Sequence, residues 1–331
     1  MGVKTSQILA YDFGLAFFKA YLFSLDNLEL YQKRISPNFP DGSESAISYL
    51  KEGLPSSEKV KIASSSSLED FSFLENPNYK VFKVSDSLND LEEVLKVKTI
   101  DLGAHIYSKK ILPDEILNFA ISKISSVEVQ DYFANKKLHL YTIPRTKFQL
   151  ELELALAKAY LSHRLKDDFP KIVLTGGVFS NYKKFQDLLF GVLDASQAKF
   201  SEVFIDEQGI CSVLGAAISS FKNKKNEILK LLKLKKLATI VNLRSGGEAK
   251  VDLGLKESQK ISLGEDDLVS VPLKGDEEVR VHVSYPTKFS FETTGSLFGL
   301  IFDGREKPLN LRSAKYKKKI LEWYEQVVPS F

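Results

Sequence analysis

The stretch Ile8-Leu9-Ala10-Tyr11-Asp12-Phe13-Gly14 decides how the rest of the chain is interpreted. Its first four residues are apolar, as expected of a central strand that is buried on both faces. The run then ends in a carboxylate and a glycine. The same pattern returns at Ile100-Asp101-Leu102-Gly103, and Leu174-Thr175-Gly176-Gly177-Val178 repeats it with two glycines and no acid.

These three turns share one chemistry. Glycine lets the backbone approach a phosphate or a sugar closely, and an aspartate can hold a hydrated divalent metal ion. The series therefore predicts a nucleotide clamp formed by two lobes. Any one of these turns alone would be an ordinary strand-to-helix connection, so the prediction depends on their order and spacing.

Composition excludes several other classes of protein. The 331 residues suffice for two or three domains with cores of their own. Lys and Arg number 46 against 43 Asp and Glu, and a net charge of +3 gives no reason to expect a specific nucleic-acid partner. The single cysteine, Cys211, excludes an internal disulfide and favours a buried packing role. No segment has the length of a membrane span and no secretory leader is evident, so we expect a cytoplasmic protein.

Hydrophobic periodicity divides the chain into an α/β part and a β-rich end. The first hundred residues follow the order βββαβ and then βαβ, and helices dominate from residue 113 to the middle. After residue 237, apolar and polar residues alternate as in a small antiparallel sheet. We therefore expect a first lobe (1–100), a second lobe (101–221), a lysine-rich linker helix (222–237) and a C-terminal β-domain with a terminal helix (238–331).

The order of the three turns resembles that of the actin-like ATPase superfamily, which includes actin, Hsp70 and sugar kinases. The resemblance implies an α/β fold in which two actin-like (ribonuclease H-like) βββαβα lobes surround a nucleotide cleft, followed by the small antiparallel β-domain. It also implies ATP or ADP with Mg as the cofactor. The binding residues that it implies are Asp12, Gly14 and Lys19 in the first phosphate loop, Asp101 and Gly103 in the second, and Gly176 and Gly177 in the adenosine loop, with Asp12 and Asp101 next to the metal.

Both phosphate loops depart from the pattern of the superfamily. Leu15 and Ala16 stand where a hydroxyl residue usually follows the first glycine, and Ala104 and His105 replace a glycine and a hydroxyl residue in the second loop. Each phosphate-facing donor that is lost removes about 3 kcal/mol of transition-state stabilisation. We therefore expect nucleotide binding with weak or absent hydrolysis. The catalytic residue is unknown, and Asp101 is the one candidate.

The C-terminal third narrows the resemblance. The segments 269–273, 279–283 and 299–305, with Pro308-Leu309, are similar to the tail of the MutL/GlmL accessory proteins of glutamate mutase. The chain is shorter than those proteins, so it resembles a reduced and divergent relative. This resemblance implies a chaperone-like accessory protein whose partner is a cobalamin-dependent mutase.

Two other functions remain open. The first is a pseudo-ATPase scaffold of a pilus, division or membrane-associated assembly, in which Lys222–Lys236 would contact a membrane surface. The alternative for this segment is a solvated lysine face over an apolar stripe that packs on the core. The second function is a small-molecule kinase of the same superfamily, in which Asp101 would take a proton from a substrate hydroxyl. The four histidines lack the spacing of metal ligands.

Overall fold

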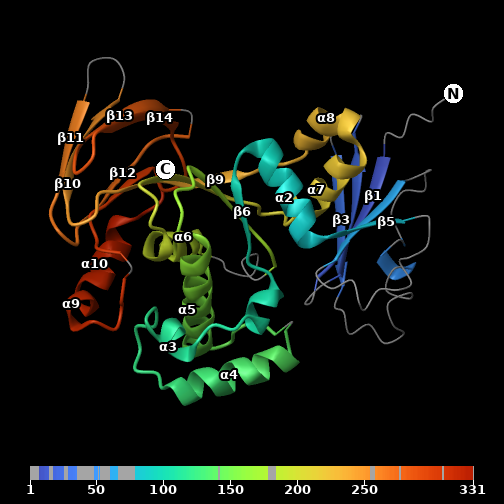
Figure 1. Cartoon of the computed structure of the whole chain (residues 1–331), viewed down its shortest axis with the longest axis horizontal. Coiled ribbons are helices and arrows are strands. Elements are labelled where there is room, and N and C mark those ends of the chain that lie inside the picture. Colours follow the sequence, from blue (N-terminus) through green and yellow to red (C-terminus); the bar gives the residue numbers. More distant parts are fainter. Residues whose placement is uncertain are drawn as a thin grey trace.

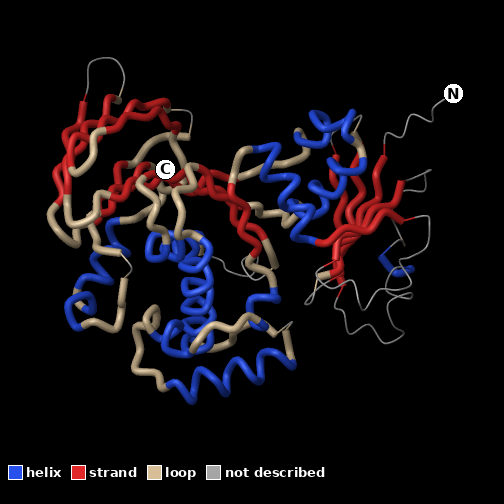
Figure 2. Tube along the Cα trace, viewed as in Figure 1, coloured by secondary structure: helices blue, strands red, loops and turns tan. Residues whose placement is uncertain are grey.

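The computed structural model describes most of the chain (Figure 1). The described residues are 7–14, 18–25, 29–35, 48–50, 52, 60–65, 79–140, 142–177, 184–253, 258–275, 277–307 and 309–330. They form sheets of five, six and four strands, and helices lie between and beside the sheets (Figure 2). In this part of the chain, no helix combines the length and the hydropathy that crossing a bilayer requires.

The first sheet has the opening stretch of the sequence at its centre. The strands β1 (Gln7–Phe13), β2 (Phe18–Ser24) and β3 (Glu29–Ile35) form an antiparallel meander. On the other side of β1, β4 (Val60–Ser65) and β5 (Tyr79–Lys83) continue the sheet in parallel, which gives the order β3-β2-β1-β4-β5. Residues 8–11 are all buried, so both faces of β1 are covered, as the apolar run predicted.

The second sheet carries the other two turns. Its strands β6 (Lys98–Asp101), β7 (Lys171–Thr175) and β8 (Phe200–Ile205) are parallel neighbours. Helix α2 (Val84–Leu95) precedes β6, while α6 (Phe185–Ala195) and α7 (Cys211–Ser220) follow β7 and β8. The chain is thus an α/β protein with two lobes, and together with the separate antiparallel sheet described below this confirms the predicted fold class except for the strand composition of the second lobe.

Helices α2 and α7 lie between the two sheets and join the lobes (Figure 1). A Cβ atom at Gly215 on α7 would lie 1.8 Å from the carbonyl oxygen of Ser87 on α2, so only glycine permits this close approach. One hydrophobic cluster combines Ile8 of the first sheet with Val173 of the second and Leu214 of α7. The lobes therefore share a core along this seam.

The second lobe differs in detail from a complete βββαβα repeat. Between β6 and β7, residues 102–170 contain no strand in the part that the structure describes, which omits only residue 141. The segment forms helices instead: η2 (Ala104–Ser108), α3 (Pro113–Leu117), α4 (Ser126–Leu138) and α5 (Lys147–Arg164). Local sequence explains this outcome, because capping boxes at Ser125 and Thr146 start α4 and α5.

The strands that follow residue 234 divide between two sheets. The strands β9 (Lys235–Asn242), β15 (Leu300–Asp303) and β12 (Leu268–Val271) extend the second sheet beyond β8. A separate antiparallel sheet contains, in order, β11 (Ser258–Leu263), β10 (Gly247–Asp252), β13 (Glu278–Tyr285) and β14 (Phe289–Thr294). The β-domain predicted for 238–331 is therefore present only in part, because β9, β12 and β15 belong to the sheet of the second lobe and only the other four strands form a separate antiparallel sheet. Helices α9 (Ala314–Lys317) and α10 (Lys319–Gln326) follow.

The expectation of one lysine-rich linker helix over 222–237 was wrong. The segment forms η4 (Lys222–Lys224) and α8 (Lys225–Leu229), and its last three residues begin β9. Lys236 is accommodated in a strand because its ammonium group lies 2.6 Å from the Glu202 carboxylate of neighbouring β8. Ile228 and Leu231 are buried, so the apolar stripe packs on the core. Contact of the lysines with a membrane surface stays a prediction.

Candidate functional site

All seven residues predicted to bind a nucleotide line one small cavity between the lobes. They come from the β1–β2 hairpin (Asp12, Gly14, Lys19), the end of β6 (Asp101, Gly103) and the end of β7 (Gly176, Gly177). The cavity has a volume of about 70 Å³. The carboxyl ends of parallel strands meet at one edge of a sheet, which is why turns so distant in the sequence converge here.

Lys19 connects the two lobes electrostatically. It stands opposite Asp12 in the β1–β2 register, with 3.8 Å between its Nζ and Asp12 Oδ2. Its charge also lowers the pKa of Asp101 across the cavity. The same ammonium group lies 3.2 Å from the position that a Cβ atom would take at Gly209. Lys19 is therefore placed to meet an anionic group bound between Asp12 and Asp101.

Asp101 and His105 form a half-buried pair with unusual proton affinities. Asp101 Oδ1 accepts a hydrogen bond of 2.9 Å from the Gly103 N–H, and Oδ2 lies 3.5 Å from His105 Nδ1. Burial raises the pKa of Asp101 to about 6, and nearby Asp206 adds to this rise. Burial, with the positive charges of Lys109 and Arg164, lowers the pKa of His105 to about 4. At neutral pH the pair therefore holds one negative charge, on Asp101.

In the wild type, Asp101 and His105 contribute opposite pH dependences to the free energy of unfolding, and these cancel. Replacing either residue should therefore expose the contribution of the other. Because the Asp101 pKa is raised on folding, its contribution to stability is present below its unfolded pKa of 3.8 and is lost as the pH rises through about 6. Because the His105 pKa is lowered, its contribution is present above 6.5 and is lost as the pH falls through about 4. Each slope reaches about 1.4 kcal/mol per pH unit, and the two have opposite signs.

Relative to the wild type, His105→Gln should lose stability between about pH 4.5 and about pH 6, and Asp101→Asn should gain stability over the same interval. Urea denaturation of each variant and of the wild type at both pH values measures the free energy of unfolding. Subtracting the wild-type value removes the contributions of all other groups. If both variants follow the wild type, the two side chains have ordinary pKa values.

The two glycines after β7 have different surroundings. Gly176 has a φ of +109°, and a Cβ atom there would lie 2.4 Å from Asp101 Oδ1 and 2.5 Å from the Gly103 nitrogen. Gly176 therefore lets the loops after β6 and β7 touch. A Cβ atom at Gly177 would meet no described atom within 4 Å. Gly177 lines the small cavity, where a ligand can approach the backbone.

Asp206, at the end of β8, belongs to this site although the motif analysis did not include it. Its Oδ2 accepts hydrogen bonds of 2.8 Å from Thr175 Oγ1 and from the Cys211 N–H. Its Oδ1 is buried and has no hydrogen-bond partner among the described residues. The signal was present, since an aspartate follows the apolar run Val203–Ile205, but no glycine comes directly after it. Cys211 itself is fully buried, as expected.

The donors present fit a hydrated Mg²⁺ rather than a metal held by protein alone. Among the described residues, no three His, Cys, Asp or Glu side chains form a group able to hold a metal ion. Mg²⁺ commonly keeps several waters and takes one or two carboxylates together with phosphate oxygens. Asp12 and Asp101 could supply those carboxylates on either side of a phosphate.

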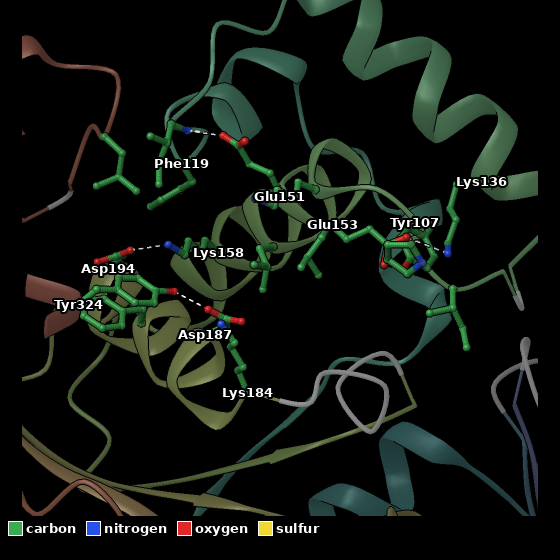
Figure 3. Close-up of a pocket in the computed structure, with 18 of the residues that line it drawn as sticks. Tyr107, Phe119, Lys136, Glu151, Glu153, Lys158, Lys184, Asp187, Asp194 and Tyr324 are labelled. Atoms are coloured by element: carbon green, nitrogen blue, oxygen red, sulfur yellow. Dashed lines mark hydrogen bonds and ion pairs between the residues drawn. The ribbon is translucent and has the colours of Figure 1, made fainter. Parts of the chain in front are cut away.

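A larger chamber of about 600 Å³ adjoins the small cavity (Figure 3). The two share Ala104 and Gly177. The chamber follows one side of α5 and reaches α6 and α10. The small cavity alone lies below the range of about 300–1,000 Å³ that is typical of small-molecule sites, whereas the chamber falls within it.

The sequence matches no protein-family model and no curated protein. Among solved structures it is similar to component A of the Acidaminococcus fermentans (R)-2-hydroxyglutaryl-CoA dehydratase, at 17% identity and a TM-score of 0.42 over 66% of this chain and 99% of that one. The ADPNP-bound activator of the Clostridium difficile 2-hydroxyisocaproyl-CoA dehydratase has 13% identity and a TM-score of 0.41, over 69% and 98%. The inorganic polyphosphate/ATP-glucomannokinase of Arthrobacter sp. strain KM has 14% identity and a TM-score of 0.37, over 66% and 100%. Similarities of this size transfer no residue role to this chain.

Proposed function

We propose that the chain binds ATP or ADP with Mg²⁺ between its lobes and that the nucleotide controls how far the lobes separate. One observation carries the proposal: glycines, carboxylates and a lysine from both lobes surround a single cavity. Backbone N–H groups of such turns can donate to phosphate oxygens, and Lys19 adds a positive charge. The two carboxylates would accept hydrogen bonds from the waters of the metal ion.

Binding would require the lobes to open. The phosphates would take the place between Asp12 and Asp101, and the nucleoside would pass Gly177 toward the chamber. A cavity of about 70 Å³ cannot hold the phosphates and the metal together, so the loops of the two lobes that line it have to separate. A ligand that binds the open state better shifts the population toward it. Nucleotide occupancy and conformation are thereby coupled.

Hydrolysis should be slow because few donors are left for a developing charge. The Thr175 hydroxyl already donates its hydrogen bond to Asp206, and the Gly103 N–H already donates to Asp101 Oδ1. A protein of this kind acts through its conformation rather than its turnover. The C-terminal segments similar to MutL/GlmL proteins support an accessory role, in which the open and closed states differ in affinity for a partner such as a cobalamin-dependent mutase.

Calorimetric titration with Mg-ATP and Mg-ADP tests the proposal. We expect dissociation constants below about 1 mM, which correspond to at least about 4 kcal/mol of binding free energy. Asp12→Asn should weaken Mg-ATP binding about tenfold and leave binding in EDTA nearly unchanged, because its role is toward the metal. Asp131→Asn, an exposed position on α4, is the matched control. If no binding is detected at millimolar nucleotide, the proposal that the chain binds ATP or ADP is wrong.

A small-molecule kinase is the second candidate, favoured by the pKa of about 6 at Asp101. A general base works best when its pKa lies near the operating pH. A screen of hydroxyl-bearing small molecules for phosphoryl transfer from Mg-ATP separates the two functions. Transfer that Asp101→Asn abolishes would favour the kinase, and nucleotide binding without transfer would favour the accessory protein.

A further inference from the structure

The inner end of the chamber holds a buried network of charged side chains. Arg305 is 1% exposed, and its guanidinium group donates to both carboxylate oxygens of Asp303, at 2.8 Å each, and to Asp194 Oδ1 at 3.0 Å. Lys158 Nζ lies 2.6 Å from Asp194 Oδ2, and Lys307 Nζ lies 2.9 Å from Asp303 Oδ2. Three cations thus share two carboxylates, which leaves an excess of one positive charge.

The cations that line the chamber have donors to spare. Among the described residues, the Lys158 ammonium group donates one hydrogen bond, to Asp194, although it carries three N–H groups. In the same part of the chain, the Arg305 side chain uses three of its five N–H groups. Both side chains line the chamber. Buried charged donors without acceptors are costly, so this end of the chamber favours an anionic ligand group.

The rest of the chamber is apolar and aromatic. Phe190 and Tyr324 stack with 4.3 Å between ring centroids, and the Arg305 guanidinium lies 4.7 Å from the Trp323 ring centroid. Leu150 and Leu154 of α5 line the same space. Figure 3 shows the Lys158–Asp194 pair beside Tyr324 at one end of this surface. A ligand that fits has an apolar body with an anionic group at one end.

The opposite end is electrically balanced. There Lys136 Nζ lies 2.8 Å from Glu153 Oε1 (Figure 3). Glu153 Oε1 also accepts a hydrogen bond of 2.6 Å from Tyr132 Oη. Five basic and four acidic side chains of the described residues line the chamber, so the chamber as a whole has an excess of one positive charge. Its excess of one positive charge matches a monoanion, whereas a doubly charged phosphate would leave a net negative charge in a site of low dielectric.

We propose that the chamber binds an apolar monocarboxylic acid, with its carboxylate held by Lys158 next to the buried Arg305 and its chain or ring along α5 and α10. The chamber adjoins the proposed nucleotide cleft at Ala104 and Gly177, so binding of the acid is tested without nucleotide. Trp323, the one tryptophan of the chain, lines the chamber and reports occupancy by its fluorescence.

The probes are octanoate, octanol and octyl phosphate, which share one chain length. We expect octanoate to bind at least about tenfold more tightly than octanol, because a charge-assisted hydrogen bond distinguishes them. Octyl phosphate should bind more weakly than octanoate. Lys158→Met should lower octanoate affinity about tenfold and leave octanol affinity unchanged. The control is Lys166→Met, an exposed lysine just beyond α5, which should change neither.

Equal affinities for octanoate and octanol, or unchanged octanoate binding by Lys158→Met, would overturn the proposal. Tighter binding of octyl phosphate would overturn the assignment of a carboxylate. If Lys158→Met does not fold, the double variant Leu150→Phe/Leu154→Phe decides the matter, because it narrows the chamber and keeps the charged network. That variant should weaken both octanoate and octanol, and undiminished binding there would place the ligand elsewhere.

Discussion

Arg305→Ala is expected to lower the free energy of unfolding by about 3–5 kcal/mol, because breaking a buried ion pair from one side leaves the other side uncompensated. The guanidinium group bonds to Asp303, at the end of β15, and to Asp194, at the end of α6. Although burial alone would raise the pKa of Asp303, Arg305 and Lys307 hold it at about 2. Without Arg305, Asp194 would keep Lys158 among the described residues, and Asp303 would keep Lys307 and the backbone N–H of residue 305.

Arg280→Ala is the matched control, since it also removes an arginine–carboxylate pair. The Arg280 side chain donates to Glu292 between β13 and β14, but the two side chains are 60% and 70% exposed. Its loss should leave the free energy of unfolding nearly unchanged, because an exposed ion pair is screened by solvent. Urea denaturation with linear extrapolation measures both variants. A loss below about 1 kcal/mol for Arg305→Ala would mean that the network does not hold α6 to β15.

The sequence predicted the first sheet and the three turns because each rests on local signals. An apolar run that ends in Asp-x-Gly needs no knowledge of distant residues, and the strand buried on both faces is visible in residues 8–11. The parallel order of β6 and β7 then brings Asp101 next to Gly176. Asp206 was missed because its role comes from Thr175 and Cys211, which approach it only in the folded chain.

The charged network illustrates what local patterns cannot predict. Asp303 and Arg305 stand in a segment that reads as an ordinary strand and turn, and Asp194 lies 111 residues before Arg305. The linker prediction failed for a related reason. Lysines usually indicate an exposed helix, yet Lys236 lies in β9 because Glu202 on the neighbouring strand neutralises it. In both places, the decisive partner is set by topology, which the sequence pattern alone did not supply.

Gly176→Ala and Gly177→Ala should affect different properties, although the two glycines are adjacent. Gly176→Ala should lower the free energy of unfolding, and Gly177→Ala should lower the affinity for Mg-ATP. At Gly176 the φ of +109° disfavours any side chain, at a cost of about 1–3 kcal/mol. The added Cβ would also lie 2.4 Å from Asp101 Oδ1, so the loops after β6 and β7 must separate. We expect a total loss of about 3 kcal/mol or more in the free energy of unfolding.

At Gly177 the new methyl group meets no described atom within 4 Å, so stability should change by less than about 0.5 kcal/mol. The same methyl group stands where the proposed nucleotide passes from the cleft toward the chamber, so Mg-ATP affinity should fall. Urea denaturation and calorimetric titration of both variants measure the two effects separately. If Gly177→Ala binds Mg-ATP as the wild type does, the nucleotide does not pass this residue. If Gly176→Ala keeps full stability, the contact between the two loops is not what holds Asp101 in place.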